Sequence, residues 1–213
     1  MIVACLNTKG GVGKTTASLN LAVSRALEGR SVLAVDGDRQ GSLIAALANR
    51  EWEPAIAASH YPDGQILRQQ VTMAKSRYDD IIIDAGGRDN TALRAALVLA
   101  DLVLIPFLPR SFDVWALEDM AGLLNEARAT RDVRALAFLA MADSRGNDNL
   151  EAAESIPEGI EYLDASIGRR KAIADAAGRG KGILEEPGRD PKAADEVRRL
   201  VAAIYRHNNS ITK

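Results

Sequence analysis

A glycine- and lysine-rich stretch near the start of the chain constrains the fold more than any other feature of the sequence. The apolar run IVACL (residues 2–6) is followed by NTKGGVGKTT (residues 7–16), which holds three glycines and two lysines. The run predicts a buried strand, and residues 15–27 predict a helix that ends near Gly29. A flexible turn between a strand and a helix is a typical phosphate site, because backbone N–H groups and the positive helix end meet there.

Apolar runs alternate with alanine-rich stretches along most of the sequence. Further strands are predicted at residues 31–36, 80–84, 101–107 and 133–141, with a short edge strand at 160–167. Further helices are predicted at 92–100, 114–130 and 190–207, and residues 49–64 are expected to form a surface excursion. Strands that are apolar throughout are buried on both faces. We therefore expect one α/β domain over residues 1–213, with a mostly parallel, twisted sheet covered by helices on both faces.

Composition excludes several classes of protein. The single cysteine, Cys5, lies inside the first apolar run, so neither an internal disulfide nor a cysteine-held cluster is expected. A formal net charge of −2 means that any binding of nucleic acid must come from a local patch. The most apolar long stretch, residues 92–108, contains Arg94 and Asp101 and predicts a helix and a strand, not a membrane span. No secretory signal is visible, so a cytoplasmic location is expected.

The first loop offers the groups that a triphosphate needs. The residues expected to surround the phosphates follow one another without a gap: Gly10, Gly11, Val12, Gly13, Lys14, Thr15 and Thr16. Lys14 is expected to reach the β- and γ-phosphates, and the Thr15 hydroxyl to ligate Mg²⁺. The alternative is a glycine-rich turn with incidental lysines. The strand, the helix and the Gly-Lys-Thr-Thr run occur together, which favours the phosphate loop.

Carboxylates follow two of the other predicted strands. The segment VDGDRQGS places Asp36 and Asp38 at the end of one strand, and IIIDAGG places Asp84 at the end of another. The carboxyl ends of parallel strands share one edge of the sheet, so these side chains should lie beside the phosphate loop. Asp84 could hold a water on Mg²⁺, and Asp36 or Asp38 could orient an attacking water.

Together these motifs resemble those of the ParA/MinD group of ATPases. KGGVGKTT resembles the deviant Walker A loop of that group, DGDRQGS its Asp-x-Asp-Pro-Gln motif, and IIIDAGG its Mg²⁺-sensing motif. LIPFLPRSFDV and IGRRKAIADA resemble later segments of small plasmid-partition ParA proteins. Met1 leads straight into the first strand, as in the short ParA type without an N-terminal helix-turn-helix domain. The resemblance implies a P-loop ATPase with ATP and Mg²⁺ as cofactors.

The resemblance also implies a role for each candidate residue. Lys9, the extra lysine, would reach across a nucleotide-sandwich homodimer to the phosphates bound by the other subunit, where it offsets their negative charge. The implied catalytic residues are Lys9, Lys14 and Asp38, of which Asp38 positions the water. The implied metal ligands are Thr15, Asp38 and, through a water, Asp84. The remaining implied nucleotide contacts are Asp36, which supports the metal shell, and Pro109.

Three positions depart from the pattern of the group. Arg39 replaces the usual proline in the second motif and so changes the loop that holds Asp38. Thr8 replaces the leading glycine of the phosphate loop. After the predicted strand, the segment AFLAMADSRGND has no asparagine at the place where such proteins often use one to read adenine, so specificity for adenine follows from the resemblance alone.

Partners are implied in the same way. ParA-like dimers bind nonspecific DNA through basic residues of both subunits, and a small ParB-like or ribbon-helix-helix partner stimulates a weak intrinsic ATPase. Between residues 169 and 199 this chain has nine Lys or Arg and six Asp or Glu. Five of the basic residues are expected to contact DNA: Arg169, Arg170, Lys171, Arg179 and Lys181. The alternative for them is a solvated face of mixed charge.

We therefore expect a ParA-like, nucleoid-associated ATPase that positions a plasmid or another cargo and does not bind membranes. A MinD-like membrane protein would expose the apolar side of its last helix, here Val197, Leu200, Val201, Ile204 and Tyr205. That spacing also suits a helix that docks on its own sheet, which is the preferred interpretation. A metabolic enzyme of the same fold would need a substrate pocket that the sequence does not reveal. An electron-transfer protein of the nitrogenase iron-protein kind is excluded by the lack of further cysteines.

Overall fold

An eight-stranded sheet forms the centre of the molecule, whose computed structural model describes residues 1–87, 90–109, 111–142 and 148–206. The strands are β1 (Ile2–Asn7), β2 (Val32–Asp36), β3 (Ala57–His60), β4 (Asp80–Gly86), β5 (Leu102–Phe107), β6 (Arg134–Ala142), β7 (Glu161–Tyr162) and β8 (Ile167–Gly168). Their order is β3-β2-β4-β1-β5-β6-β7, with β8 also paired to β6. All seven strand pairings are parallel.

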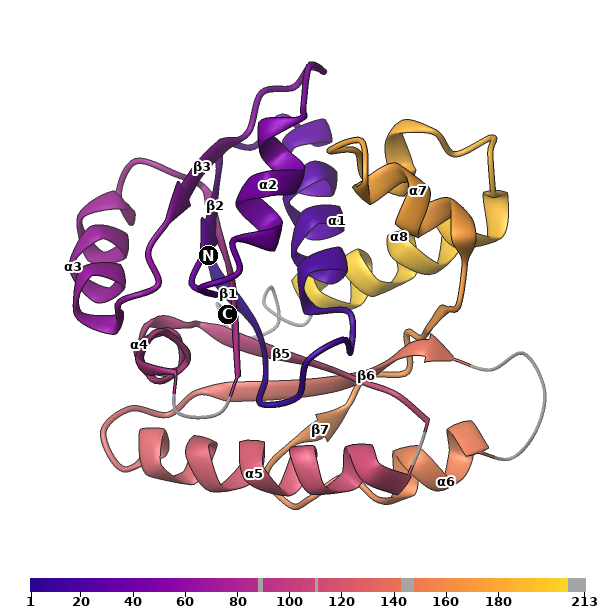
Figure 1. Ribbon diagram of the computed structural model, residues 1–213. Coiled ribbons are helices and arrows are strands. Elements are labelled where there is room, and N and C mark those ends of the chain that lie inside the picture. Colours follow the sequence, from indigo (N-terminus) through magenta and orange to yellow (C-terminus); the bar gives the residue numbers. More distant parts are fainter. Residues whose placement is uncertain (88–89, 110, 143–147, 207–213) are drawn as a thin grey trace.

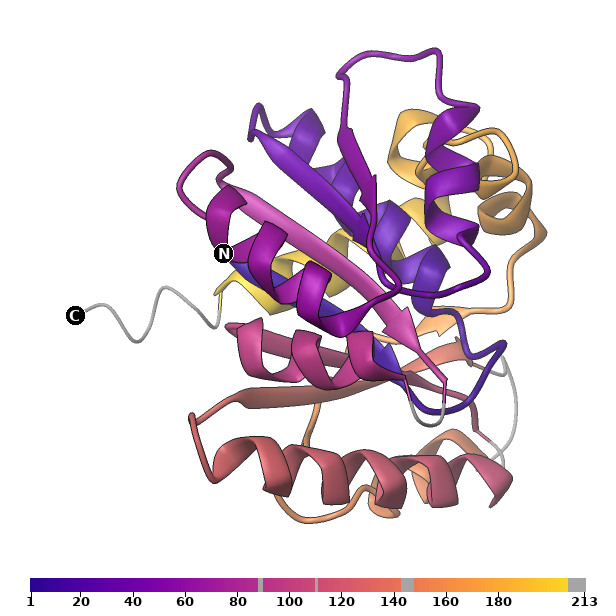
Figure 2. The same cartoon turned by 60° about the vertical axis from the view of Figure 1, so that its left-hand side comes forward.

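Helices cover both faces of this sheet (Figures 1 and 2). They are α1 (Lys14–Leu27), α2 (Ser42–Ala48), α3 (Gly64–Ala74), α4 (Thr91–Leu99), α5 (Ser111–Arg128), α6 (Asp148–Glu154), α7 (Lys171–Ala177) and α8 (Pro191–Arg206), with a 3₁₀ turn at Ile183–Glu185. Alternate residues of β1 enter two separate cores, because side chains of a strand point to opposite faces. Helices α3, α4 and α5 pack on one core, and α1, α2, α7 and α8 on the other. The predicted fold class is confirmed.

The expectation for residues 49–64 was wrong in part: the segment is mostly exposed, as a surface excursion would be, but it also contains a strand. Residues Ala57–His60 form β3, an edge strand that pairs in parallel with β2. The strand is mostly exposed, and its sequence AASH has no apolar run that would reveal it. Short edge strands are held by backbone hydrogen bonds more than by burial, so hydrophobic patterning misses them. Helices α2, α3, α6 and α7 were likewise not predicted.

The last helix docks on the sheet, as preferred from the sequence. Val197, Leu200, Val201 and Ile204 are all buried in the core that α1 shares. The apolar side of α8 is therefore used in packing and is not available to a lipid surface. Nowhere in the described ranges is there a helix with the length and hydrophobicity needed to cross a bilayer.

Polar contacts fix the amino end of β4, the central strand that carries the third motif. Arg25 at the end of α1 donates from Nε to Asp80 Oδ2 over 2.7 Å. The backbone N–H of Ser31 donates to Asp79 Oδ2 over 2.8 Å. The Asp80 side chain is buried, so its charge requires such a partner. The start of the strand is thereby tied to α1 and to the residue before β2.

A buried ion pair joins the segment after α2 to the segment between α7 and α8. Arg50 forms two hydrogen bonds with Glu185, of 2.8 and 2.9 Å, and the two side chains are 4% and 8% exposed. Arg50 Nη1 also donates to the carbonyl oxygen of Gly180, and Nη2 donates to that of Pro54, each over 3.0 Å. The guanidinium is therefore well satisfied, and it holds the 178–186 segment against α2.

Replacing Glu185 by alanine should destabilise the protein strongly, because Arg50 would remain buried without its counter-ion. We expect the free energy of unfolding to fall by roughly 3–5 kcal/mol, measured by urea denaturation followed by circular dichroism. The control is Asp195→Ala, which removes an exposed ion pair with Arg198. Exposed pairs contribute about 0.5 kcal/mol, so a similar loss in both variants would contradict the prediction.

Candidate nucleotide-binding site

The predicted site residues meet at the carboxyl ends of β1, β2 and β4. In the sheet, Asp84 of β4 lies beside Cys5 of β1 and Asp36 of β2, and Gly86 lies beside Asn7. The phosphate loop and the second and third motifs therefore lie next to one another, at the edge where parallel sheets bind ligands. Pro109 is buried just after the end of β5.

The loop leaves β1 through a buried asparagine. Asn7 Nδ2 donates to the carbonyl oxygen of Pro106 over 2.9 Å, and its Oδ1 accepts from the N–H of Lys9 over 2.8 Å. Gly10 and Gly11 are exposed and Val12 is buried. Because Asn7 fixes the loop's first turn, the exposed glycines are held above the sheet edge.

Helix α1 begins without a side-chain cap. Its N-cap is Gly13, whose φ of 94° is in the left-handed region that favours glycine. The first turn contains no acidic residue. N–H groups of an uncapped first turn need an acceptor, and the positive end of the helix favours an anion there. The start of α1 is therefore suited to phosphate oxygens.

Lys14 is buried within the site, with 8% of its surface exposed. Its side chain passes directly over Gly86, where a Cβ atom would lie 2.2 Å from Lys14 Cε and 2.8 Å from the carbonyl oxygen of Asn7, so only glycine fits at that position. Its Nζ donates to the carbonyl oxygen of Lys9 over 2.8 Å. Burial lowers the pKa of Lys14, while the nearby carboxylates of Asp84 and Asp38 act in the opposite direction.

Asp84 and Thr15 form the part of the site suited to a metal ion. The Thr15 hydroxyl donates to Asp84 Oδ2 over 2.6 Å, and Asp84 Oδ1 is buried without a hydrogen-bond partner. Burial raises the pKa of Asp84 to about 7. An unsatisfied buried carboxylate oxygen next to a hydroxyl fits a hydrated Mg²⁺. No three His, Cys, Asp or Glu side chains converge on a metal position in the described residues, so phosphate and water would supply the other ligands.

The two carboxylates of the second motif occupy different environments. Asp36 is buried and accepts three backbone N–H groups, from Asp38 over 3.0 Å, Leu43 over 2.8 Å and Ile44 over 3.0 Å. It thus holds the motif and the start of α2 in place. Asp38 is half-exposed, and its carboxylate accepts from the N–H of Gln40 over 3.0 Å. Of the two, Asp38 has the carboxylate that can face a water beside the phosphate loop.

Two residues that support the site were missed in the sequence. Asn90 caps α4 through the N–H of Ala92 over 2.9 Å, and it donates to the carbonyl oxygen of Gly86 over 2.7 Å. An asparagine directly before a helical pattern was a signal for this cap. His60 Nε2 lies 2.7 Å from the carbonyl oxygen of Asp38. His60 could not be found because its strand, β3, was not predicted.

A cavity of about 470 Å³ opens beside the phosphate loop. Its lining includes Gly13, Thr16, Ala17, Phe138, Ala140, Met141, Ile173 and Ala174. Most of these side chains are apolar, and Gly13 and Thr16 connect the cavity to the start of α1. Such a cavity suits a flat, largely apolar ring attached to the phosphates.

Three of the residues expected to bind DNA also lie at the edge of this cavity. They are Arg169, Arg170 and Lys171. Arg170 is bound to Glu196 over 2.8 and 2.5 Å. Arg169 and Lys171 are exposed and pair with no carboxylate among the described residues. No pattern in the sequence indicates that these residues lie so near the phosphate loop.

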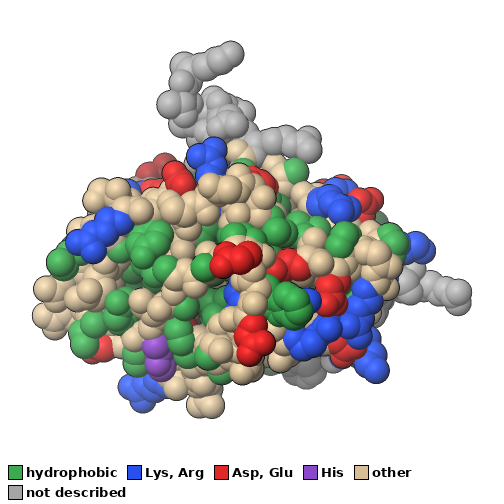
Figure 3. All heavy atoms as spheres, turned by 90° about the horizontal axis from the view of Figure 1, so that it is seen from above, with side chains coloured by type: hydrophobic (Ala, Val, Ile, Leu, Met, Phe, Trp, Pro, Cys, Tyr) green, Lys and Arg blue, Asp and Glu red, His purple; other side chains and the backbone are tan. Residues whose placement is uncertain are grey.

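The other two expected DNA contacts are neutralised within the chain. Arg179 and Lys181 both bind Glu186, over 2.6 and 2.9 Å, and together they hold the pKa of Glu186 down to about 2. Lys181 also lies 3.4 Å above the ring of Trp52. Figure 3 shows Lys and Arg side chains next to Asp and Glu on one face of the molecule. Much of the segment between residues 169 and 199 therefore fits the alternative interpretation, a solvated face of mixed charge.

The raised pKa of Asp84 predicts how the stability of the ligand-free protein depends on pH. The folded state binds the proton of Asp84 more tightly than the unfolded state, so the contribution of Asp84 to stability is greatest below about pH 4 and is lost as pH rises toward 7. We expect Asp84→Asn to remove this loss, which amounts to roughly 4 kcal/mol. Urea denaturation of both proteins in EDTA at pH 5, 6, 7 and 8 measures the difference. A difference that does not change with pH would contradict the prediction.

Known proteins share this arrangement. A sequence model described as the CobQ/CobB/MinD/ParA nucleotide binding domain matches residues 3–183. The chain is 28% identical over 209 residues to the Maintenance of carboxysome distribution protein A of Halothiobacillus neapolitanus, with 95% of each chain covered. It is 30% identical over 238 aligned positions to the chromosome-partitioning ATPase Soj of Thermus thermophilus, covering 95% of this chain and 94% of Soj.

Solved structures agree on the fold. The septum site-determining protein MinD of Pyrococcus horikoshii, in complex with Mg-ADP, superposes with a TM-score of 0.77 at 19% identity, with 95% of each chain covered. The family match extends from β1 to the 3₁₀ turn and contains the phosphate loop, both carboxylate motifs and the cavity. The chain therefore belongs to the CobQ/CobB/MinD/ParA family of nucleotide-binding proteins and is a ParA/MinD-type ATPase.

Proposed function

We propose that this protein is a switch of the ParA kind. Two Mg·ATP-bound copies form a sandwich dimer, the dimer binds nonspecific DNA, and a partner protein stimulates hydrolysis so that a cargo is positioned. The observation that carries the proposal is the Thr15–Asp84 pair with its unsatisfied carboxylate oxygen, next to the buried Lys14. The proposal treats residues 1–213 as one ATPase domain.

The residues of the site have distinct tasks in this proposal. Lys14 and the N–H groups at the start of α1 bind the β- and γ-phosphates. Thr15 would ligate Mg²⁺ through its hydroxyl, and Asp84 would hold a water bound to the ion. Bound Mg²⁺ supplies charge neutralisation at the phosphate oxygens. Asp38 would position the attacking water, and Asp36 keeps the Asp38 loop in place through its three backbone contacts.

The adenine base would lie in the cavity beside Gly13 and Thr16. The cavity is continuous with the start of α1, and its apolar lining can pack on a purine ring. This assignment supplies a place for the base without the asparagine that such proteins often use. The segment in which that asparagine was sought includes residues 143–147, which lie outside the described residues.

Lys9 would join the two subunits. It lies in the phosphate loop before the exposed Gly10 and Gly11, and its side chain is partly buried. A triphosphate with one Mg²⁺ keeps excess negative charge, which a second cation in a dry interface neutralises. Dimer stability then depends on the γ-phosphate, so slow hydrolysis sets the lifetime of the dimer.

The cargo and the DNA surface follow from relatives and from charge. Two relatives are named for carboxysome distribution and for chromosome partitioning, which supports a positioning role and leaves a plasmid as a third class of cargo. Arg169 and Lys171 are the expected DNA contacts that form no ion pair with a described residue. Dimerisation doubles the number of such contacts, so DNA affinity should depend steeply on salt. Such binding would associate the protein with the nucleoid.

A MinD-like role at a membrane is less well supported. The residues that such a role would expose on α8 are buried against the sheet. A lipid-binding segment would thus have to come from elsewhere in the chain. The metabolic alternative requires a second substrate beside the nucleotide, and no observation at the site favours one.

Replacing Lys9 by alanine should abolish the dimer while nucleotide binding is retained. The measurement is hydrodynamic mass, together with binding to a random-sequence DNA duplex, with ATP, with ADP and without nucleotide. We expect the unchanged protein to dimerise and bind DNA only with ATP, and Lys9→Ala to stay monomeric, because the charge between the two nucleotides is then uncompensated.

The matched control is Lys14→Ala, which should lose nucleotide binding itself. A Lys9→Ala protein that still dimerises with ATP would contradict the role given to Lys9. An ATP dimer of the unchanged protein that ignores DNA even at low salt would contradict the DNA part of the proposal alone.

Filling the cavity should separate base binding from phosphate binding. Ala174 lines the cavity from α7 and is exposed, so Ala174→Trp can place its ring there without disturbing a core. We expect the affinity for ATP to fall at least tenfold, whereas the affinity for inorganic tripolyphosphate should stay within twofold. Calorimetric titration of both ligands measures the difference. Equal effects on the two ligands would place the base elsewhere.

A further inference from the structure

Asp38, the residue proposed to position water, begins a tight turn before α2. The carbonyl oxygen of Asp38 accepts the N–H of Gly41 over 3.1 Å, which is the hydrogen bond of a four-residue β-turn. Within the turn, the Asp38 carboxylate accepts the N–H of Gln40 over 3.0 Å. The turn ends at Gly41, the N-cap of α2, whose φ of 63° is in the left-handed region. The direction of the Asp38 carboxylate therefore depends on how firmly this turn is held.

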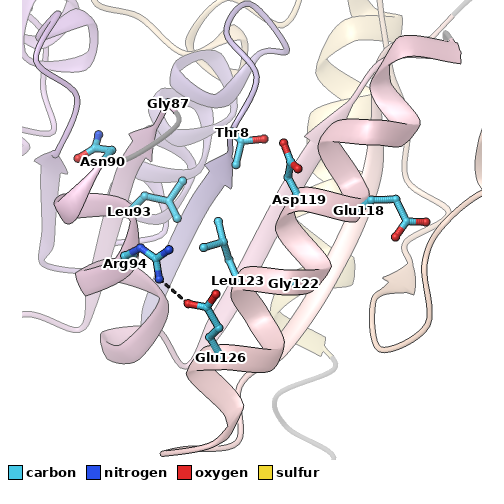
Figure 4. A pocket seen from close by; sticks show the side chains of 10 residues that line it. All are labelled: Thr8, Gly87, Asn90, Leu93, Arg94, Glu118, Asp119, Gly122, Leu123 and Glu126. Carbon is cyan, nitrogen blue, oxygen red and sulfur yellow. Dashed lines mark hydrogen bonds and ion pairs between the residues drawn. The ribbon is translucent and has the colours of Figure 1, made fainter.

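The two residues before the turn are fixed from several sides. Asp36 accepts three backbone N–H groups. The N–H of Gly37 donates to the carbonyl oxygen of Asp84 over 2.7 Å, and a Cβ atom at Gly37 would lie 3.1 Å from each of three neighbouring side chains. Asn90, at the start of α4 (Figure 4), donates to the carbonyl oxygen of Gly37 over 3.4 Å. The backbone up to residue 37 thus has little freedom.

Arg39 leaves the turn itself with less restraint. It occupies the second position of the turn, where proline is favoured because its ring fixes φ, and it replaces the usual proline of the second motif. The Arg39 side chain is exposed, and it forms neither a hydrogen bond nor an ion pair with any described part of the chain. Arginine allows more backbone conformations at this position than proline does. The turn therefore needs another contact if Asp38 is to keep one orientation.

The edge strand β3 provides such a contact. Its last residue, His60, pairs with Asp36 in the sheet, and the N–H of Tyr61 donates to the carbonyl oxygen of Asp36 over 2.8 Å. These bonds place the His60 ring beside the turn, where its Nε2 lies 2.7 Å from the carbonyl oxygen of Asp38. A carbonyl oxygen only accepts, so Nε2 carries the hydrogen, which is possible for the neutral and for the charged ring. The oxygen that closes the turn thus receives a second hydrogen bond from a different element.

The His60 ring also lies near the end of the turn. A Cβ atom at Gly41 would lie 3.6 Å from Cε1 and 3.8 Å from Nε2 of His60. His60 is exposed, and β3 as a whole is mostly exposed, so the ring adds little to the hydrophobic core. Removal of the ring should therefore disturb the turn more than the fold.

We propose that His60 is a positioning residue for Asp38, and that its ring supplies the restraint that a proline at position 39 would otherwise give. The inference rests on the proposed function, in which Asp38 positions the attacking water. His60 lies outside the lining of the cavity proposed for the base. It should therefore affect the rate of hydrolysis and not the affinity for ATP. Because the histidine and a proline would provide the same restraint, their effects should not be additive.

The test combines changes at both positions. The variants are His60→Leu, His60→Gln, whose amide can still donate, Arg39→Pro, and His60→Leu together with Arg39→Pro. The control is Ala58→Leu, which places the same leucine at another exposed position of β3. Each protein is measured for kcat and KM of ATP hydrolysis and for ATP affinity by calorimetry. In the protein without nucleotide, NMR measures the exchange rate of the Gly41 amide hydrogen, which reports on the turn independently of hydrolysis.

We expect His60→Leu to lower kcat roughly tenfold and to accelerate exchange at Gly41 by a similar factor. Small displacements of a catalytic group are costly, and a turn with fewer contacts opens more often. KM and the affinity for ATP should stay within about twofold. His60→Gln and the control should remain near the unchanged protein. Arg39→Pro should restore both kcat and the protection of Gly41 to His60→Leu.

Unchanged exchange at Gly41 in His60→Leu would overturn the proposal, as would a His60→Gln protein as impaired as His60→Leu. A defect that Arg39→Pro leaves in place would overturn it too. An equal defect in Ala58→Leu would assign the effect to β3 as a whole, which also refutes the role of the ring. If the unchanged protein neither binds nor hydrolyses ATP, the proposed function fails, whereas exchange at Gly41 still decides whether His60 holds the turn.

Discussion

The burial of Lys14 and Asp84 at the ends of adjacent strands is the interaction on which the site depends. Each group is charged in water and costly to bury, so each needs its partners at hydrogen-bond distance. Lys14 has the carbonyl oxygen of Lys9, and Asp84 has the Thr15 hydroxyl for only one of its oxygens. Glycine is required at position 86 because a Cβ atom there would clash with the lysine and with the carbonyl oxygen of Asn7. The unsatisfied oxygen marks where this arrangement is incomplete without a ligand.

Much of the fold could be predicted because its central strands are apolar on both faces and its loops carry unusual residues. The candidate phosphate loop and the three aspartates were predicted in this way, and the parallel sheet that brings them together is confirmed. Strand β3 was not found, because an exposed edge strand leaves no apolar pattern. The pairing of Arg179 and Lys181 with Glu186 was also beyond the sequence. Charge composition gives the number of charges but not which of them neutralise each other.

Buried hydrogen bonds connect the second motif, through α2, to the C-terminal part of the molecule. Asp36 holds the start of α2, and Arg50, just after that helix, binds Glu185 and the carbonyl oxygen of Gly180. That segment follows α7, which forms one wall of the cavity proposed for the base. The phosphate side and the base side of the site are thus joined by a short path of buried polar contacts. Helix α2 is the rigid element in the middle of this path.

The polar contacts at the start of β4 determine more than the stability of that strand. Its three consecutive isoleucines, 81–83, point alternately into two apolar cores, so a shift by one residue would exchange side chains of the same kind. Hydrophobic burial alone therefore distinguishes poorly between the two alignments. The bonds of Asp79 to Ser31 and of Asp80 to Arg25 do distinguish them. These bonds lie at the start of β4, about 13 Å along the strand from residue 84. They determine whether residue 84 presents its carboxylate to Thr15. The position of the Asp84 carboxylate at the candidate site is therefore set by contacts at the opposite end of β4.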